Sequence, residues 1–381
     1  MSVAPPEQKT PVRGLENVVA GETRVSHVDG VNGLLVYNGY DVHELAAATT
    51  YEEVVHLLWR NRLPNRRELE DLRARLVGEM RLPPQVIEMI RLAPAGAHPM
   101  DVLRTAVSAL SMFDPDAGNL SPEANERKMV RLLAQVMTII ADMHRVWSGR
   151  SVVSADPQLD TGDNFLYMFR GEPPDEEEAA AFDHLLLLHL DHGFNASTFA
   201  ARVTASTLSD MHAALTSAIG ALKGALHGGA NERVLVMLQK IDNVGEVESY
   251  IEGMLNDKKR IMGFGHRVYK VEDPRARLLR TWSERLCRRA NMSQLYEISH
   301  RIEEVVLAKK GIYPNVDFYS ATVQHALGIP RQYFTAIFAA ARTAGWLAHI
   351  MEQYADNRLI RPTSNYIGGW NQHVVPIDQR P

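Results

Sequence analysis

The sequence of 381 residues predicts an all-α protein with two helical lobes. Apolar residues recur at helical spacing along almost the whole chain, and runs with the alternation of a strand are scarce. The length also exceeds the roughly 250–300 residues at which a single hydrophobic core stops growing. A larger and a smaller helical domain are therefore expected.

The predicted helices follow one another with short breaks. In YEEVVHLLWRN, at 51–61, the apolar residues share one face, and the proline of RLPN ends the helix. Similar runs occupy 66–80, 84–93, 99–112, 123–147, 176–192, 195–222, 232–241, 246–258, 274–290, 297–309, 318–327 and 331–355. Strand signals are limited to GLLVYNGYDV, at 33–42, and to HVVPI near the end of the chain, so only small ribbons are expected.

Two breaks in the helical pattern mark the expected domain boundaries. GALHGGA at 224–230 and GIP at 328–330 enclose the predicted smaller domain, 224–330. Residues 1–223 and 331–381 then form the larger domain. Its run at 195–222 is dense in Ala, Ser, Thr and Gly, which suits a buried central helix or a subunit interface.

Charge and apolar content limit the classes of function. A net charge of -5 and a pI near 6.3 provide no basic field for nucleic acid. No signal-like start and no apolar run of about 18 residues is present, so we expect no membrane span and a cytoplasmic location. The single Cys287 excludes an internal disulfide and is expected to be a packed thiol. An anionic substrate would have to be held by a local cluster of cations.

Three of the fifteen histidines differ from the others. Most lie singly on amphipathic helices, where a capped or half-buried imidazole is expected. His192 in DHGFNAST, His227 in GALHGGAN and His266 in GFGHRVYKVEDPR instead lie next to glycines. Glycine permits tight turns and close approach of the backbone to a ligand, so these histidines are candidates for a functional site.

His227 precedes a predicted helix. Asn231 is expected to cap this helix, and the positive end of the helix dipole favours a neutral imidazole at His227. A neutral imidazole suits acid–base chemistry in which a proton is shared. The alternative is a glycine-rich turn with a histidine on the surface.

The stretch around His266 combines glycine with positive charge. Arg267, Lys270 and Arg275 follow His266 closely, and such cations hold carboxylates or phosphates. A basic turn in solvent is the alternative, although it would not require the two glycines. We assign no role to Arg267.

A candidate base lies in PNVDFYS at 314–320. Asp317 has apolar neighbours, which would raise the pKa of its carboxyl group toward the range useful for a base. Alternatively, Asp317 is an N-cap. Two neutral imidazoles and one carboxylate are the groups needed to remove a proton next to a carbonyl and to stabilise the enolate.

Several blocks of the chain resemble the citrate synthase family. GFGHRVYKVEDPR, GALHGGANE, DHGFNASTF, GIYPNVDFYS and RTAGWLAHIMEQ match blocks of the family in the same order, and the similarity extends from RGLENVVAGET at 13–23 to NRLIRPTSNYIG at 357–368. The chain is most similar to the shorter bacterial and archaeal type. The resemblance implies an all-helical homodimer, or an oligomer of such dimers, whose smaller domain closes over the substrates.

The resemblance also implies a reaction, the condensation of acetyl-CoA with oxaloacetate and water to citrate and CoA at the entry to the tricarboxylic acid cycle. Asp317 would take a methyl proton from acetyl-CoA, and His227 would hydrogen-bond the thioester oxygen as the enol forms. His266 would polarise the ketone of oxaloacetate. Water would then hydrolyse the resulting citryl-CoA. The protein would be an acyltransferase that converts the acyl group to an alkyl group.

Binding positions follow from the same resemblance. The oxaloacetate positions are His192, Arg275, Arg342 and Arg361, the last reaching across from the partner subunit. The CoA positions are Arg260, Ile261, Met262, Gly263, Phe264 and Lys270. Lys309 and Lys310 are either further phosphate contacts or a solvated helix end. CoA enters as a thioester substrate, and neither a tightly bound cofactor nor a metal is implied.

Two departures from the family pattern lie next to these positions. Gly193 follows His192 where many members carry Glu, and this change affects how tightly His192 is oriented. Ala225 stands where Pro is frequent and would soften the hinge beside His227. Neither change alters a reacting group.

Three alternative functions compete with this interpretation. A 2-methylcitrate synthase using propionyl-CoA has the same reacting groups, and one methylene in an apolar pocket is worth only ~1–3 kcal/mol. Acetyl-CoA is favoured, with propionyl-CoA as an alternative or second substrate. A metal hydrolase built on His184, His189, Asp191 and His192 is disfavoured, because their spacing does not bring the imidazoles onto one helix face. A scaffold without activity would have no need of the matched histidines, carboxylate and cations.

Overall fold

The computed structural model describes residues 10–94 and 96–380. In these ranges it contains sixteen α-helices and one three-stranded sheet, so the predicted all-α class is confirmed. The α-helices are α1 Val42–Ala48, α2 Tyr51–Arg60, α3 Arg66–Gly78, α4 Pro84–Leu92, α5 Pro99–Leu110, α6 Pro122–Trp147, α7 Thr161–Arg170, α8 Glu176–His189, α9 Ala196–Ser206, α10 Met211–Leu222, α11 Ala230–Leu238, α12 Val247–Asn256, α13 Pro274–Arg289, α14 Ser293–Lys310, α15 Val316–Ala326 and α16 Phe334–Ala355. Short 3-10 helices are η1 Arg13–Leu15, η2 Val244–Glu246, η3 Arg331–Tyr333 and η4 Ile377–Gln379.

The chain divides into two compact units. Thr23–Arg358 forms one unit, which holds all the α-helices and the sheet. The two ends of the chain, described over 10–22 and 359–380, form the other unit, with η1 and η4 as its helical turns. None of the helices in the described ranges is long and apolar enough to cross a membrane.

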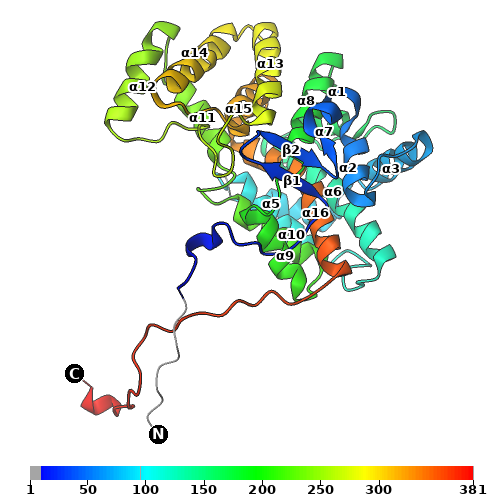
Figure 1. Ribbon diagram of the computed structural model, residues 1–381. Coiled ribbons are helices and arrows are strands. Elements are labelled where there is room, and N and C mark those ends of the chain that lie inside the picture. The colour runs from blue at the N-terminus through cyan, green and yellow to red at the C-terminus, as the bar shows by residue number, and fades with distance from the viewer. Residues whose placement is uncertain (1–9, 95, 381) are drawn as a thin grey trace. The chain divides into compact units, whose positions relative to one another are not determined.

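The centre of the helical unit is α16, which packs on α6, α8, α9 and α10 (Figure 1). Most of its residues are buried, because its sequence is apolar or small around nearly its whole circumference. At Gly345 a Cβ atom would lie 2.2 Å from the carbonyl oxygen of Leu190. The absence of a side chain at Gly345 therefore allows α16 to lie against the turn that carries Asp191 and His192.

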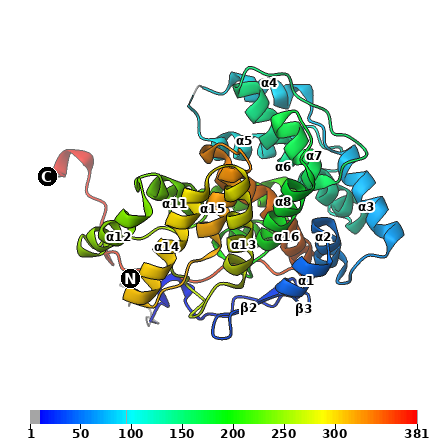
Figure 2. The same cartoon turned by 90° about the horizontal axis from the view of Figure 1, so that it is seen from above.

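Helices α11 to α15 pack largely on one another, as Figures 1 and 2 show. The closest of these pairs is α13 with α15, and α12 packs on α14. Contacts of α13 with α8 and of α11 with α16 join this group to the other helices. The group belongs to the same compact unit as those helices.

The sheet is a small antiparallel ribbon in the order β1-β2-β3. Its strands are β1 Ser26–Asp29, β2 Leu34–Tyr37 and β3 Tyr40–Asp41, with Ser26 opposite Tyr37. The strand signal at 33–42 is thus correct for β2 and β3, whereas β1 was not predicted. The expected strand HVVPI is wrong, since residues 373–376 have no regular structure and η4 begins at Ile377.

The single helix predicted at 195–222 is wrong. The structure has α9 and α10 there, which pack on each other and are separated by a turn at 207–210. Leu208 has a left-handed φ of 60°, and the side chain of Asp210 accepts a hydrogen bond from the Ala213 N–H at 3.0 Å, which starts the second helix. Small residues on both sides of this turn made the two helices look continuous in sequence.

Other differences have local causes. Helix α7 was not predicted, although Asp160 caps it and Gly171 ends it in the left-handed region. The run predicted at 176–192 ends at His189, so His192 lies in the turn after α8. His192 therefore lies outside the helix, so its imidazole is not part of a helix face.

Candidate active site

Hydrogen bonds join the loop that carries His266 to the loop that leads into α15 and Asp317. Phe264 and Pro314 form an isolated β-bridge. The Asn315 N–H donates to the Gly263 carbonyl at 2.8 Å, and the Asn315 side-chain amide donates to the Gly265 carbonyl at 2.9 Å. The two loops are therefore held in a fixed register.

Gly263 is required by this junction. Its φ is 79°, and a Cβ atom would lie 2.8 Å from Phe318 Cβ and from Val234 Cγ2. Both the backbone conformation and the space thus demand glycine. Gly263 therefore lets the His266 loop pack closely against Phe318 of α15 and Val234 of α11.

The tautomer of His266 is set by its own loop. Its Nδ1 accepts hydrogen bonds from the N–H groups of Val268 at 3.0 Å and Tyr269 at 3.1 Å. Because Nδ1 accepts, the proton of the neutral ring lies on Nε2. Burial lowers the pKa of His266 to about 4, with a further contribution from Arg275. His266 is therefore a neutral hydrogen-bond donor through Nε2.

His227 is neutral as well, for a different reason from the one expected. Burial lowers its pKa to about 4, assisted by the charge of Arg342. The predicted cap is wrong, because α11 begins at Ala230 after Gly229 without a side-chain cap, and Asn231 Oδ1 accepts from the N–H of Glu232. Desolvation therefore accounts for the low pKa of His227.

Ser197 orients the ring of His227. The Ser197 N–H donates to His227 Nε2 at 3.3 Å, and the hydroxyl oxygen lies 2.8 Å from the same nitrogen. The hydroxyl also accepts from Trp346 Nε1 at 3.1 Å, and its oxygen lies 2.7 Å from Asn195 Oδ1. With Nε2 as an acceptor, the proton of His227 lies on Nδ1. Ser197 was not singled out in the sequence, because a helix-start serine has no distinctive pattern.

Asp317 lies in the first turn of α15 but does not cap it. The N-cap is Asn315, whose Oδ1 accepts from the Asp317 N–H at 3.0 Å. Asp317 Oδ1 is buried and has no hydrogen-bond partner among the described residues. Burial raises the pKa of Asp317 to about 7, although Arg275 lowers it. The alternative role as N-cap is wrong, and the expected raised pKa is confirmed.

Arg275 is joined to the Asp317 helix through Asp273. The Nε and Nη2 atoms of Arg275 donate to the two carboxylate oxygens of Asp273 at 3.0 and 2.8 Å. Asp273 Oδ2 also accepts from the N–H of Val316 at 3.2 Å. These bonds tie the start of α13 to the start of α15. Asp273 was missed in the sequence, although an Asp before Pro274 is a strong helix-start signal.

Arg342 is a buried cation that forms no ion pair with a carboxylate of the described residues. Its side chain is almost fully buried, and Nε donates to the His189 carbonyl at 2.6 Å. The guanidinium carbon lies 4.9 Å from the centre of the Phe338 ring, and no carboxylate of the described residues is within ion-pair distance. Burial lowers its pKa to about 10. A desolvated guanidinium of this kind forms a site for an anionic ligand.

His192 lies against His266, with ring centres 5.0 Å apart. Its Nε2 is 3.2 Å from the hydroxyl of Tyr269, and burial lowers its pKa well below the usual value. The preceding Asp191 fixes the turn, because its Oδ2 accepts from the Gly193 N–H at 2.9 Å and from the Ser26 hydroxyl. Tyr269 and Asp191 were not selected as site residues from the sequence.

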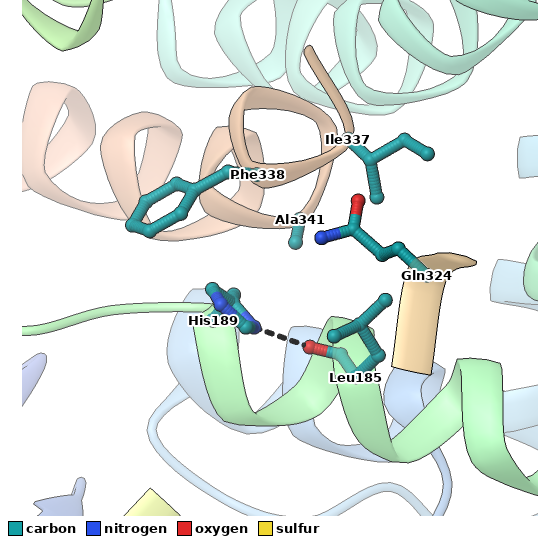
Figure 3. A pocket seen from close by; sticks show the side chains of 6 residues that line it. All are labelled: Leu185, His189, Gln324, Ile337, Phe338 and Ala341. Atoms are coloured by element: carbon teal, nitrogen blue, oxygen red, sulfur yellow. Dashed lines mark hydrogen bonds between the residues drawn. The ribbon is translucent and has the colours of Figure 1, made fainter. Parts of the chain in front are cut away.

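A small cavity is lined by six residues that include His189 and Phe338 (Figure 3). It has about 160 Å³ of space between atoms and no room for a water molecule. His189 Nδ1 donates to the Leu185 carbonyl at 2.7 Å, and Gln324 Oε1 accepts no hydrogen bond from the described residues. This space is a gap in packing between α8, α15 and α16, and it is too small for a substrate.

Of the remaining predicted positions, Ile261 and Met262 are partly buried against the core, whereas the charged ones are exposed. The side chains of Arg260 and Lys270 are exposed, and the Lys270 N–H donates to the Gly30 carbonyl at 2.8 Å. Arg361 is exposed and belongs to the unit formed by the chain ends. Lys309 pairs with Glu248 at 3.1 Å and with Glu252 at 2.6 Å, as in a solvated helix end.

The thiol of Cys287 is packed in the core, and the described residues contain no group suited to a metal ion. Cys287 is buried, and burial raises its pKa to about 11, so the expected packed thiol is confirmed. Within 10–94 and 96–380, no three His, Cys, Asp or Glu side chains are grouped so that they could hold a metal ion. The fold and the site together define an all-helical enzyme whose candidate acid–base groups lie near two buried arginines, Arg275 and Arg342.

Comparison with known proteins identifies the family. The family model described as citrate synthase, C-terminal domain, matches residues 14–363. Citrate synthase 2 of Bacillus subtilis is 48% identical, over 97% of this chain and 100% of its own length. The citrate/2-methylcitrate synthase of the same organism is 41% identical, over 93% of this chain and 96% of its own length. The chain belongs to the citrate synthase family and is an acyltransferase, as the resemblance predicted.

A solved structure supports the same conclusion. It is the ternary complex of carboxymethyl coenzyme A and oxaloacetate with citrate synthase from the archaeon Thermoplasma acidophilum. Its TM-score is 0.93 at 33% identity, and the match covers 98% of this chain and all of that chain. The fold is therefore that of a citrate synthase over nearly its whole length.

Proposed function

We propose that this protein condenses acetyl-CoA with oxaloacetate and water to citrate and CoA. The observation that carries the proposal is the set of protonation states. His227 and His266 are neutral rings with pKa values of about 4, whereas Asp317 has a carboxyl with a pKa of about 7. An enolisation near neutral pH needs a base of this strength beside neutral donors.

Oxaloacetate would bind first to the cations. Arg342 has no carboxylate partner among the described residues, and Asp273 engages only two of the donor nitrogens of Arg275. These two guanidinium groups suit the two carboxylates of the substrate. The Nε2–H of His266 would donate to the ketone oxygen, and His192 would contact a carboxylate.

Asp317 would then remove a proton from the methyl group of acetyl-CoA. The Nδ1–H of His227 would donate to the thioester oxygen, so that the enol forms without full negative charge. Its methylene carbon attacks the ketone carbon that His266 polarises, and the new C–C bond gives citryl-CoA. Water hydrolyses the thioester to citrate and CoA.

CoA binding and domain closure form part of the same proposal. The backbone of Arg260, Ile261, Met262, Gly263 and Phe264 would meet the adenine, and Lys270 would contact a phosphate. Residues 224–330 would close over both substrates as the smaller domain, and 1–223 with 331–381 would form the larger. Gly328, with a φ of 75°, ends α15 at the proposed hinge.

A homodimer, or an oligomer of such dimers, would complete each site. Arg361 would reach the oxaloacetate of the partner subunit. The chain ends expose large apolar side chains, with Val19 87%, Ile367 89% and Val374 91% exposed. A second copy of the chain that buried these side chains would remove this apolar surface from water, which supports the dimer. The cytoplasmic location stays a prediction.

Propionyl-CoA is the second candidate substrate, which would make 2-methylcitrate. The 41% identity to a citrate/2-methylcitrate synthase supports propionyl-CoA as a candidate substrate. It differs from acetyl-CoA by one methylene, which an apolar pocket discriminates by only about 1–3 kcal/mol.

Thiol release tests the proposal. Purified protein is mixed with oxaloacetate and either acetyl-CoA or propionyl-CoA, with and without EDTA. We expect faster thiol release with acetyl-CoA, dependent on oxaloacetate and unchanged by EDTA. Absence of turnover with both thioesters would reject the synthase reaction, and loss of activity only in EDTA would support the metal hydrolase.

A further inference from the structure

Tyr269 lies between two imidazoles of the site and contacts both. Its N–H donates to His266 Nδ1 at 3.1 Å, and its hydroxyl lies 3.2 Å from His192 Nε2. The centre of its ring is 4.7 Å from that of His266 and 5.4 Å from that of His192. The residue therefore touches one histidine through its backbone and the other through its phenol.

The phenol is the main polar support of the His192 ring. The ring nitrogens of His192 reach no other side chain of the described residues. The other acceptor of the phenol, the Leu34 carbonyl, is 3.5 Å away, so the bond to His192 is the better one. Burial raises the pKa of Tyr269 and lowers that of His192, which keeps both groups neutral near neutral pH.

The turn around His192 offers the ring a backbone hydrogen bond of His192 itself but no second side-chain partner among the described residues. Gly193 follows it with a left-handed φ of 59° and has no side chain. Asp191 fixes the backbone of this turn through the Gly193 N–H and the Ser26 hydroxyl. Rotation of the His192 ring is therefore controlled from the His266 loop, by Tyr269.

We propose that Tyr269 is a positioning residue for oxaloacetate. Its phenol holds the His192 ring in the orientation that binds a substrate carboxylate, and its N–H keeps the Nε2–H of His266 directed at the ketone. One residue thus aligns the group that binds oxaloacetate with the group that polarises it. The inference rests on the proposed function, which makes His192 an oxaloacetate contact.

Tyr269→Phe isolates the phenol, because the ring and the N–H to His266 remain. Loss of one neutral hydrogen bond should raise the KM for oxaloacetate about 2- to 13-fold. The kcat at saturating oxaloacetate and the KM for acetyl-CoA should stay within about twofold of wild type. An unchanged oxaloacetate KM, or a loss of kcat alone, would overturn the proposal.

Tyr354→Phe is the matched control. It removes a half-buried phenol that donates to the Ser209 carbonyl at 2.6 Å, on the part of α16 beyond His349. We expect its oxaloacetate KM to equal that of wild type. A similar rise in both variants would show a general loss of packing and would overturn the positioning role.

A double-mutant cycle tests whether Tyr269 acts through His192. In a His192→Ala background, Tyr269→Phe should no longer change the dissociation constant for oxaloacetate measured by calorimetry. An equal effect in both backgrounds would refute action through His192. The bound ketone carbon, observed by ¹³C NMR, should keep its shift in Tyr269→Phe, because His266 retains both backbone bonds.

Wild-type protein separates the two proposals. If it neither binds oxaloacetate nor releases thiol, the proposed function is wrong. If it does both and Tyr269→Phe behaves identically, only the positioning role fails.

Discussion

Asp317→Asn should remove activity and stabilise the folded protein, with a gain that depends on pH. The folded-state pKa of Asp317 is raised from 3.8 to about 7, chiefly by burial. At about 1.4 kcal/mol per pKa unit, the folded protein loses about 4 kcal/mol by holding this carboxylate above pH 7. Asparagine has nearly the same shape and no charge, so it avoids this penalty.

The direction of the pH effect follows from the raised pKa. An unfolded chain releases the Asp317 proton near pH 4, whereas the folded protein retains it up to about pH 7. Wild type therefore loses stability relative to Asp317→Asn as the pH rises through this range. The stability gain of the variant should be about 2 to 3 kcal/mol larger at pH 8 than at pH 5.

Chemical denaturation at both pH values measures this difference, and thiol release measures turnover. Loss of the base should lower kcat by about 10²- to 10⁴-fold. Asp71→Asn is the control, since the side chain of Asp71 is 66% exposed and lies away from the site. A near-normal kcat would refute Asp317 as the base, and a gain independent of pH would refute the desolvated carboxylate.

Three further outcomes are expected. Lowering the pH from 8 to 6 should reduce kcat/KM about tenfold, because the pKa of Asp317 is about 7 and the ionised fraction of the base falls by that factor. Initial rates that do not change with pH would contradict Asp317 as the base. Arg342→Met should raise the KM for oxaloacetate about 30-fold or more, and an unchanged KM would argue against the anion site. The melting temperature should not fall, because the substitution removes a buried charge that has no carboxylate partner among the described residues. Gly263→Ala should lower the free energy of unfolding by about 2–4 kcal/mol in urea titrations, since the new Cβ would lie 2.8 Å from Phe318 and Val234. Gly253→Ala is the control and should not lower the free energy of unfolding, because there is open space around Gly253.

Local signals predicted most of the scaffold correctly. Helices such as α2, α3 and α8 start at residues with capping boxes, which are visible as Thr50 with Glu53, Asn65 with Glu68 and Asp175 with Glu178. Such caps act over a few residues, so the sequence contains them directly. The failure at 195–222 shows the limit, because Leu208 adopts a left-handed conformation that few side-chain types signal.

The candidate site was predicted in part. His192, His266, Arg275 and Asp317 were selected, and the structure brings them together. Their supports were missed, including Ser197, which contacts His227, and Asp273, which binds Arg275. A supporting residue has an ordinary side chain, and its role arises only from the atom that it meets after folding.

The sequence by itself determined the helical class and the family, and it predicted the candidate reacting groups, because periodicity and motif blocks are properties of the linear chain. Only the tertiary structure decided the states of those groups. His227 and His266 are neutral, Asp317 has a raised pKa and Arg342 lacks a carboxylate partner among the described residues because the packed helices exclude water from them. Desolvation and hydrogen bonding depend on neighbours that are distant in the chain, and no local pattern encodes them.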